Sequence, residues 1–308
     1  MRSAFIAAVF WGILGSASIA REIYVNNISG DDKLCGDMAV ATTNINGPVR
    51  TINKALRLAL AGDRVVLANT GQPYRESISL QGERHSSVRE NAFVLQGNGA
   101  ILDGSAPVPD DRWEYVEGDI FRFQPQLKAH QQLFLNGQSL AQNQQAAEQG
   151  PIQLKPLDWC LFDGWICFRT EAGKIPQQYS PSYAALQTGI TLYQSHDVVI
   201  YDLIVQGFQL DGIQANECLG GRLIAVTSRA NGRSGVCVAG GSRMEISDSA
   251  LESNGVTELL LEDYPVVRLF DSRLSPDVPG DIQRRDAGRL YLDSQLLSAK
   301  ALKEISRK

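Results

Sequence analysis

The sequence predicts an all-β fold of stacked parallel strands, and two observations support this prediction. β-patterned segments recur with a period of 23 residues, at Ile200, Leu223, Ile246 and Leu269, and again at Ile213, Val236, Leu259 and Ile282. Within each segment apolar and polar residues alternate, whereas a helix would repeat its apolar residues at i, i+3, i+4 and i+7. A fixed period of this length indicates a solenoid. We therefore expect a three-sheet parallel β-helix with about 23 residues per turn.

Each repeat has the same predicted order of elements. In the repeat that begins at Val199, a first strand ends at a bend at Asp202, and a second strand follows over residues 203–206. The loop GFQLD leads to a third strand, GIQA, and the turn NECLGG begins the next repeat. Asp202, Asp248 and Asp271 share the bend position, where short polar side chains bond to the backbone, so we interpret them as structural.

Upstream of the repeats, Tyr24-Val25, the Gly-Asp-Asp of residues 30–32 and residues 47–82 (GPVRTINKALRLALAGDRVVLANTGQPYRESISLQG) form a further pattern. They resemble the start of exported proteins of the pectate lyase-like superfamily, whose fold is a right-handed parallel β-helix. The resemblance covers residues 24–290 and implies a helix that plugs the N-terminal end of the solenoid. Its motifs are specific for the fold, and no catalytic signature transfers to this chain.

The capping helix can also be argued from its residues. Thr51 is a good N-cap, Ile52, Ala55, Leu56 and Ala59 form an apolar face, and Gly62 is a stop signal. Residues 63–68 (DRVVLA) then form the first core strand, and residues 93–104 continue the stack. An open end of a sheet exposes unpaired backbone groups, so a cap is physically required.

Three segments lie outside the repeats. Residues 1–20 combine a short positive start, an apolar run too short to cross a bilayer and the small residues of Ser18-Ile19-Ala20, as in a signal peptide cleaved before Arg21. Residues 105–188 break the period and predict a β-rich insertion within a single domain of residues 21–290. Residues 291–308 form a lysine-rich C-terminal tail. No later segment has the length of a membrane span, so we expect an exported, monomeric protein.

Composition narrows the range of partners. The 308 residues carry a formal net charge of −5 without a Lys/Arg run, which argues against nucleic acid as a partner. Five cysteines suit an oxidising compartment, and Cys160 and Cys167, which flank a predicted hairpin, are the best candidates for a disulfide. No C-x-x-C motif or Cys/His cluster predicts a zinc site.

The first candidate site lies on the third strands. If Ile213, Val236 and Leu259 point inward, the alternate positions Gln214, Asn216, Glu258 and Glu262 point outward. The 23-residue period then stacks Glu258 on Asp281 and Glu262 on Arg285. Two stacked carboxylates are unfavourable without a shared proton, a calcium ion or a nearby arginine. Their spacing near 5 Å is that of a retaining glycosidase pair, and inverting enzymes have a wider spacing. The alternative is a solvated face with one surface ion pair.

The second candidate site lies at the loop side of the same sheet, at Asp211, Arg229 and Arg233. A polysaccharide lyase needs a cation beside the uronate carboxylate and a base for the α-proton. The resemblance implies that calcium and a basic residue fill these roles, and Arg233 beside Asp211 has the required chemistry. The alternative is that Asp211-Gly212 and Asn231-Gly232 are ordinary turns.

Two functions from different classes fit this sequence. The first is an enzyme that acts on an extracellular polysaccharide by β-elimination or hydrolysis, with Glu258, Asp281, Asp211 and Arg233 as catalytic candidates. Gln214, Asn216, Glu262 and Arg285 are then the candidates for binding substrate. The second is a non-catalytic β-helix that binds glycans or belongs to a surface layer. Clustered carboxylates in a groove favour the first, and a flat face with scattered polar residues favours the second.

Overall fold

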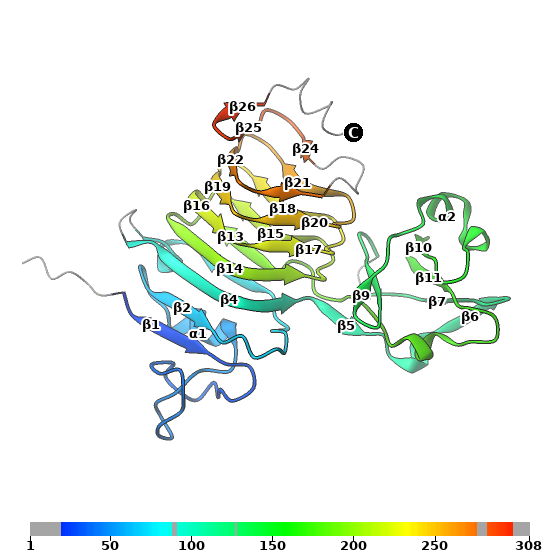
Figure 1. Cartoon of the computed structure of the whole chain (residues 1–308), viewed down its shortest axis with the longest axis horizontal. Helices are drawn as coiled ribbons and strands as arrows, with labels where there is room; N and C mark the ends of the chain where they lie inside the picture. Colours follow the sequence, from blue (N-terminus) through cyan, green and yellow to red (C-terminus); the bar gives the residue numbers. More distant parts are fainter. Residues whose placement is uncertain (1–19, 88–90, 127, 276–281, 298–308) are drawn as a thin grey trace, which may run out of the picture.

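The computed structural model describes residues 20–87, 91–126, 128–275 and 282–297. Over these ranges the chain is mostly β-strand, and its larger sheets consist of parallel strands (Figure 1). The repeats stack along one direction, and residues 105–184 project to one side of the stack (Figure 1). Among the described residues, no helix has both the length and the apolar character needed to cross a membrane.

The largest sheet follows the first strand of each repeat. Its parallel order is β1 (Glu22–Val25), β2 (Arg64–Leu67), β4 (Phe93–Asp103), β14 (Val198–Gln206), β16 (Leu219–Ile224), β19 (Arg243–Ser247), β22 (Val266–Phe270) and β25 (Arg289–Leu292). Beyond the bend, the second half of β14 pairs with a row made of β17 (Thr227–Arg229), β20 (Ala250–Glu252) and β23 (Arg273–Leu274).

The bend between these two rows has the same backbone conformation in every repeat. Asp202, Ala225, Asp248 and Asp271 have φ of 52°, 54°, 51° and 43°. This left-handed conformation is uncommon for non-glycine residues but is tolerated by Asp and Asn. The predicted bend at Asp202 and its 23-residue recurrence therefore agree with the backbone.

A second parallel sheet contains the third strands. Its order is β3 (Ile78–Gln81), β13 (Ile190–Tyr193), β15 (Asp211–Asn216), β18 (Ser234–Ala239), β21 (Thr257–Leu261) and β24 (Ile282–Arg284). We call it the six-stranded sheet. Ile213 pairs with Val236, Val236 with Leu259 and Leu259 with Ile282, as the period predicts. These side chains are buried in one continuous apolar core together with the inward residues of the other rows.

The predicted N-terminal helix forms as α1 (Ile52–Leu58), and the Thr51 hydroxyl caps it by accepting from Lys54 N at 3.1 Å. α1 packs against β1, β2 and β3, the first strands of the stack. His85, in the short 3-10 turn η1 (Glu83–His85), holds this helix in place. Its Nδ1 accepts from Gln81 N at 3.1 Å, so its Nε2 donates to Leu56 O at 2.9 Å.

Residues 105–184 leave the stack after β4 and return before β13. They form two four-stranded antiparallel sheets, in the orders β5-β12-β8-β9 and β10-β11-β7-β6. The strands are β5 (Ser105–Pro107), β6 (Glu114–Glu117), β7 (Ile120–Phe123), β8 (Leu133–Leu135), β9 (Gln138–Ser139), β10 (Trp159–Phe162), β11 (Trp165–Arg169) and β12 (Pro181–Ala184). A short helix, α2 (Gln144–Gln149), packs on β10, and the 3-10 turns are η3 (Asp110–Arg112), η4 (Pro151–Gln153) and η5 (Pro176–Tyr179). Trp159 is fully buried in the apolar core of this part.

The predicted hairpin of residues 159–168 is present, and Cys160 lies opposite Cys167 across β10 and β11. Both side chains are free thiols, as are Cys35, Cys218 and Cys237, so the expected disulfide is not formed in this structure. At the C-terminal end, β25 turns back into the antiparallel β26 (Gln295–Leu296). The remainder of the predicted tail lies outside the described residues.

Candidate functional site

The outer face of the six-stranded sheet is polar over its first three strands. Ser79, Thr191 and Gln214 lie in register on β3, β13 and β15, one residue after the buried positions Ile78, Ile190 and Ile213. Neighbouring parallel strands are about 4.8 Å apart, so these side chains form a row of hydroxyl and amide groups. The same row continues with Cys237 and Leu260, which are buried, and with Gln283.

The first three residues of this row, Ser79, Thr191 and Gln214, line an open cleft of about 520 Å³. Its lining consists of hydroxyl and amide side chains, two apolar residues and one cation, namely Ser77, Ile78, Ser79, Gln187, Thr188, Thr191, Leu210, Gln214 and Arg233. Two residues predicted from the sequence, Gln214 and Arg233, thus meet in one cleft. Among the described lining residues there is no carboxylate.

Arg233 is held in the cleft by a buried partner. Its Nε donates to Asp211 Oδ1 at 2.9 Å, its Nη2 donates to Asp211 Oδ2 at 2.5 Å, and Ser234 Oγ donates to the same carboxylate at 2.6 Å. The Asp211 side chain is fully buried, whereas that of Arg233 is 18% exposed. The hydrogen bonds that Arg233 donates to Asp211 raise the pKa of Arg233, so the guanidinium stays charged. The guanidinium of Arg233 is therefore accessible in the cleft, whereas the carboxylate of Asp211 is not.

His130 is an exposed residue outside the cleft lining whose side chain is influenced by the charges of this ion pair, although no motif in the sequence marks it. It stands in the left-handed region, with φ of 53°, and its carbonyl packs so tightly on Gly232 that any Cβ there would clash with it. The neighbouring Ala129 O accepts from Gln209 Nε2. Desolvation and repulsion from Arg233 lower the pKa of His130, with Asp211 opposing them. The imidazole is thus mostly neutral at neutral pH.

The predicted orientation of Glu258 is wrong. Its side chain is fully buried, and its carboxylate accepts from the backbone N of Asn254, at 3.3 Å, and from Asn254 Nδ2. Asn254 Oδ1 in turn accepts from Asn231 Nδ2 at 2.9 Å, and Asn231 Oδ1 accepts from Phe208 N at 3.1 Å. Glu258 thus ends a ladder of buried asparagines inside the stack and does not line the cleft.

The remaining candidates are spread over the same sheet. Asp281 lies outside the described residues, so the pairing of Glu258 with Asp281 stays a prediction. Glu262 and Arg285 form the predicted surface ion pair, with Nη1 and Oε1 2.7 Å apart. Asn216 lies at the far end of β15 from Asp211 and is not part of the cleft lining.

The surroundings of Asp211 do not fit a calcium ion. Calcium prefers six to eight oxygen ligands, several of them carboxylates. Both oxygens of Asp211 already accept hydrogen bonds from Arg233 or Ser234, and the guanidinium would repel a cation. Within the described ranges there is also no group of three or more His, Cys, Asp or Glu side chains arranged to hold a metal ion.

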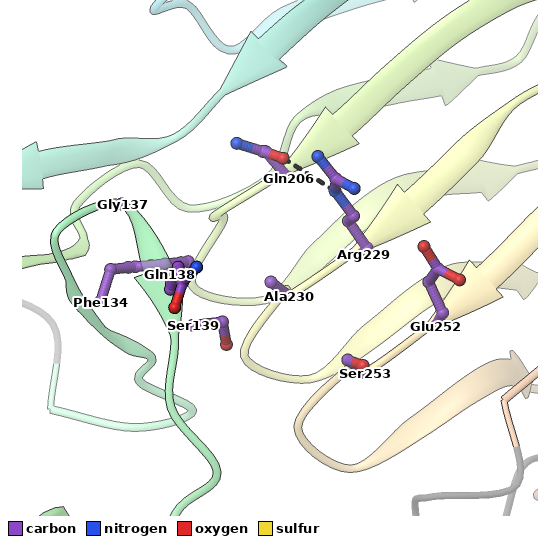
Figure 2. A pocket seen from close by; sticks show the side chains of 9 residues that line it. All are labelled: Phe134, Gly137, Gln138, Ser139, Gln206, Arg229, Ala230, Glu252 and Ser253. Atoms are coloured by element: carbon purple, nitrogen blue, oxygen red, sulfur yellow. Dashed lines mark hydrogen bonds between the residues drawn. The ribbon is translucent and has the colours of Figure 1, made fainter. Parts of the chain in front are cut away.

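Arg229, the other arginine of the second candidate site, lines a different pocket. It extends from β17, which belongs to the row beside the six-stranded sheet, and its pocket lies against residues 134–139 of the projecting part (Figure 2). That pocket shares no lining residue with the Arg233 cleft. The structure therefore separates two arginines that the sequence placed in one candidate site.

Comparisons with known proteins show that this chain is similar in fold to solved structures. No protein-family model and no curated protein matches the chain. One similar solved structure is described as the complex structure of XylC with xylose, with a TM-score of 0.47 and 11% identity, covering 88% of this chain and 63% of that one. This chain thus spans less than two thirds of the length of that protein. Another, described as a glycoside hydrolase, has a TM-score of 0.54 and 8% identity over 81% of this chain and 77% of that chain. The latter similarity indicates a shared all-β fold.

Proposed function

We propose that the chain is a carbohydrate-active protein whose six-stranded sheet binds an acidic polysaccharide, with Arg233 contacting a sugar carboxylate. The observation that carries this proposal is the composition of the cleft. Hydroxyl and amide groups at Ser79, Thr191 and Gln214 match the hydroxyl groups of a sugar chain, and they lie beside a guanidinium that Asp211 orients. An arginine with one edge fixed presents its remaining N–H groups to a planar carboxylate at little entropic cost.

We also propose that the stacked strands form a right-handed parallel β-helix. Two features support this architecture: the 23-residue register and the recurring left-handed bend. Parallel strands joined by a crossover connection are right-handed in nearly all proteins, which supports the handedness. In such a helix the outer face of one sheet offers a long, regular surface along which a polysaccharide can lie.

Export is part of the same proposal. A polysaccharide-binding protein must meet its ligand outside the cell, and the apolar run of residues 4–15 followed by Ser18-Ile19-Ala20 supports a cleaved signal peptide. Residues 1–19 lie outside the described residues. Sequencing the N-terminus of the secreted protein tests this step, and a mature start at Arg21 is the expected result.

A second candidate function, cleavage by β-elimination, is favoured by the interaction of His130 with the charge of Arg233. Arg233 would neutralise the uronate carboxylate, and the neutral imidazole would accept the proton from the adjacent ring carbon. The carbon–oxygen bond to the leaving sugar then breaks, a carbon–carbon double bond forms, and the leaving oxygen takes a proton from water or from the imidazolium. Hydrolysis by a carboxylate pair has less support, because the described lining contains no carboxylate.

Binding is tested with the chain from Arg21 and a panel of polygalacturonate, alginate, glucuronoxylan and neutral xylan, using affinity electrophoresis. We expect retention by at least one acidic polymer and about tenfold weaker binding of Gln214→Ala. Gln283→Ala is the matched control, because Gln283 lies in the same outward row but outside the cleft. Equal binding of all three proteins would overturn the assignment of the cleft.

Cleavage is tested on the same panel by following unsaturated ends and new reducing ends. Unsaturated ends that disappear in His130→Ala support elimination. Reducing ends without unsaturation would indicate hydrolysis and remove His130 from the proposal. Retention of the polymer without either product would leave a non-catalytic binding protein.

A further inference from the structure

A second pocket lies where the projecting part meets the stack. It has a volume of about 370 Å³, within the range of small-molecule sites. In Figure 2 its two walls come from different parts of the chain. One wall consists of side chains at the ends of β14, β17 and β20, and the other consists of the hairpin of β8 and β9.

The wall on the stack is a row of three polar side chains. Gln206, Arg229 and Glu252 lie in register on neighbouring strands, so their side chains project side by side (Figure 2). Arg229 Nε donates to Gln206 Oε1 at 3.0 Å, and Gln206 Nε2 donates to Asp103 Oδ2 at 3.2 Å. Arg273 Nη2 donates to Glu252 Oε2 at 3.1 Å. Each side chain of the row is thus held by a neighbour, while the Nη groups of Arg229 and Oε1 of Glu252 complete the polar surface.

The opposite wall supplies further hydrogen-bonding groups. Gln138 and Ser139 are exposed on β9, and their backbone is fixed by pairing with Phe134 and Leu135 of β8. An amide and a hydroxyl therefore face a guanidinium and a carboxylate across the pocket (Figure 2). Donors and acceptors on two rigid walls are suited to a compact ligand with several hydroxyl groups.

The charges of this pocket do not favour an anion over a neutral ligand. Arg229 and Glu252 have opposite signs and lie on adjacent strands, and the Asp103 and Arg273 side chains that bond to the row also have opposite signs, so the row carries little net charge. A carboxylate-bearing sugar would be attracted by Arg229 and repelled by Glu252. A neutral sugar can instead donate a hydrogen bond from one hydroxyl to the Glu252 carboxylate. An adjacent hydroxyl can accept a hydrogen bond from the Arg229 guanidinium.

We propose that this pocket is a second carbohydrate site, which binds a neutral glycosyl unit between Gln206, Arg229 and Glu252 on the stack and Gln138 and Ser139 on the hairpin. It goes beyond the proposed function, because it shares no lining residue with the Arg233 cleft and takes a sugar of different charge. Two parts of the chain build it together, which gives the projecting residues a role in ligand binding.

The test uses the chain from Arg21 and three neutral probes, xylohexaose, cellohexaose and mannohexaose, with binding followed by ligand-observed NMR and calorimetry. We expect at least one probe to bind at millimolar affinity or better. Ser139→Trp, which fills the pocket from an exposed position, should abolish this binding, and Glu252→Gln should weaken it about tenfold. Glu245→Gln, on the neighbouring sheet face, is the matched control and should bind as the parent does.

The outcome is separable from that of the Arg233 cleft. Gln214→Ala should leave the binding of neutral probes unchanged, and Ser139→Trp should leave the binding of acidic polymers unchanged. The proposal is overturned if none of the three probes binds, or if Ser139→Trp and Glu252→Gln bind them as the parent does. It is equally overturned if Ser139→Trp loses an acidic polymer while the neutral probes are unaffected.

Discussion

Arg233 binds Asp211 with two nitrogens of its guanidinium, from a position one residue short of a full repeat along the chain. The partners are unequal in exposure, because Asp211 is buried and Arg233 reaches the cleft. Removal of the arginine therefore leaves a buried charge without its counter-ion. Such a loss costs more than the ion pair contributes when it is intact.

We predict that Arg233→Gln lowers the free energy of unfolding by about 3–5 kcal/mol. The double variant Asp211→Asn/Arg233→Gln should recover part of this loss, because it also removes the buried charge. Arg285→Gln, which breaks the exposed pair with Glu262, should cost about 0–1 kcal/mol. Urea denaturation of the four proteins measures these differences. Equal losses for Arg233→Gln and Arg285→Gln would show that Asp211 is hydrated in solution.

Two variants of Glu258 can distinguish a structural role in the asparagine ladder from a catalytic role. As the end of the asparagine ladder, it accepts from the backbone N–H of Asn254, and Glu258→Leu should cost about 1–3 kcal/mol by leaving that buried group without this acceptor. Glu258→Gln retains an acceptor oxygen and should be milder. If Glu258 were catalytic, Glu258→Gln would abolish cleavage and leave stability intact. Chemical denaturation and product assays on both variants distinguish the two results.

Gly232 is predicted to be intolerant of any side chain. A Cβ at this position would clash with the carbonyl oxygens of His130 and Gln209, which are backbone atoms and cannot rotate away. Gly232→Ala should therefore destabilise the protein by about 1–3 kcal/mol and displace His130 from Arg233. Gly241→Ala is the control, because its Cβ would approach only the flexible end of Glu217, at 3.2 Å. Thermal melting of both variants is the measurement, and a parent-like Gly232→Ala would contradict the packing described here.

The stability of the protein should fall in mild acid. Burial lowers the pKa of His85 below its unfolded value of about 6.5, with repulsion from Arg84 adding to the effect and the bond to Leu56 opposing it. The folded state thus binds fewer protons than the unfolded state. His85 contributes its full stability above about pH 6.5, and this contribution is lost as the pH falls through the folded pKa.

The test of this pH dependence is urea unfolding of the parent and of His85→Gln between about pH 5 and 8. A glutamine can still accept from Gln81 N and donate to Leu56 O, but it does not titrate. We expect a shallower loss of stability on the acid side for His85→Gln. His130 contributes in the same direction, so some slope should persist in that variant. Identical slopes for both proteins would exclude His85 as the titrating group.

The stacking of the strands could be predicted from the sequence because it depends on a period. Ile213, Val236 and Leu259 occupy equivalent places, and equal spacing along the chain becomes hydrogen-bonded register in space. The helix capped by Thr51 was predictable for a similar reason, since its capping and its apolar face are local. Neither prediction depends on contacts between segments that are far apart in the sequence and occupy non-equivalent positions.

The orientation of Glu258 was missed because strict alternation was assumed up to the start of the strand. In the two preceding repeats this register position is a glycine, Gly212 and Gly235, where a Cβ would press on the side chains of the asparagine ladder. The sequence does contain a signal for the ladder, since Asn231 and Asn254 are 23 residues apart. Asparagines with the period of the repeat indicate a buried ladder more strongly than they indicate turns.

The place of His130 and the Arg229 pocket could not be read from the period. Both depend on how residues 105–184 pack against the stack, which is a contact between segments without equivalent positions. The glycine at position 232 is a local sign of that contact, and its meaning becomes clear only from the carbonyl groups that surround it. Sites built by one repeating element are thus predictable, and sites built by two unlike parts are not.

The recurring bend at Asp202, Ala225, Asp248 and Asp271 sets a unit of growth for this molecule. A change of one residue inside a strand would turn the rest of that strand to the opposite face, whereas duplication of a whole unit preserves each orientation. Copying residues 226–248 in place should lengthen the stack by about 4.8 Å and add one more position to each binding surface. The length of the molecule, and with it the length of polymer that it can hold, can therefore change in discrete steps.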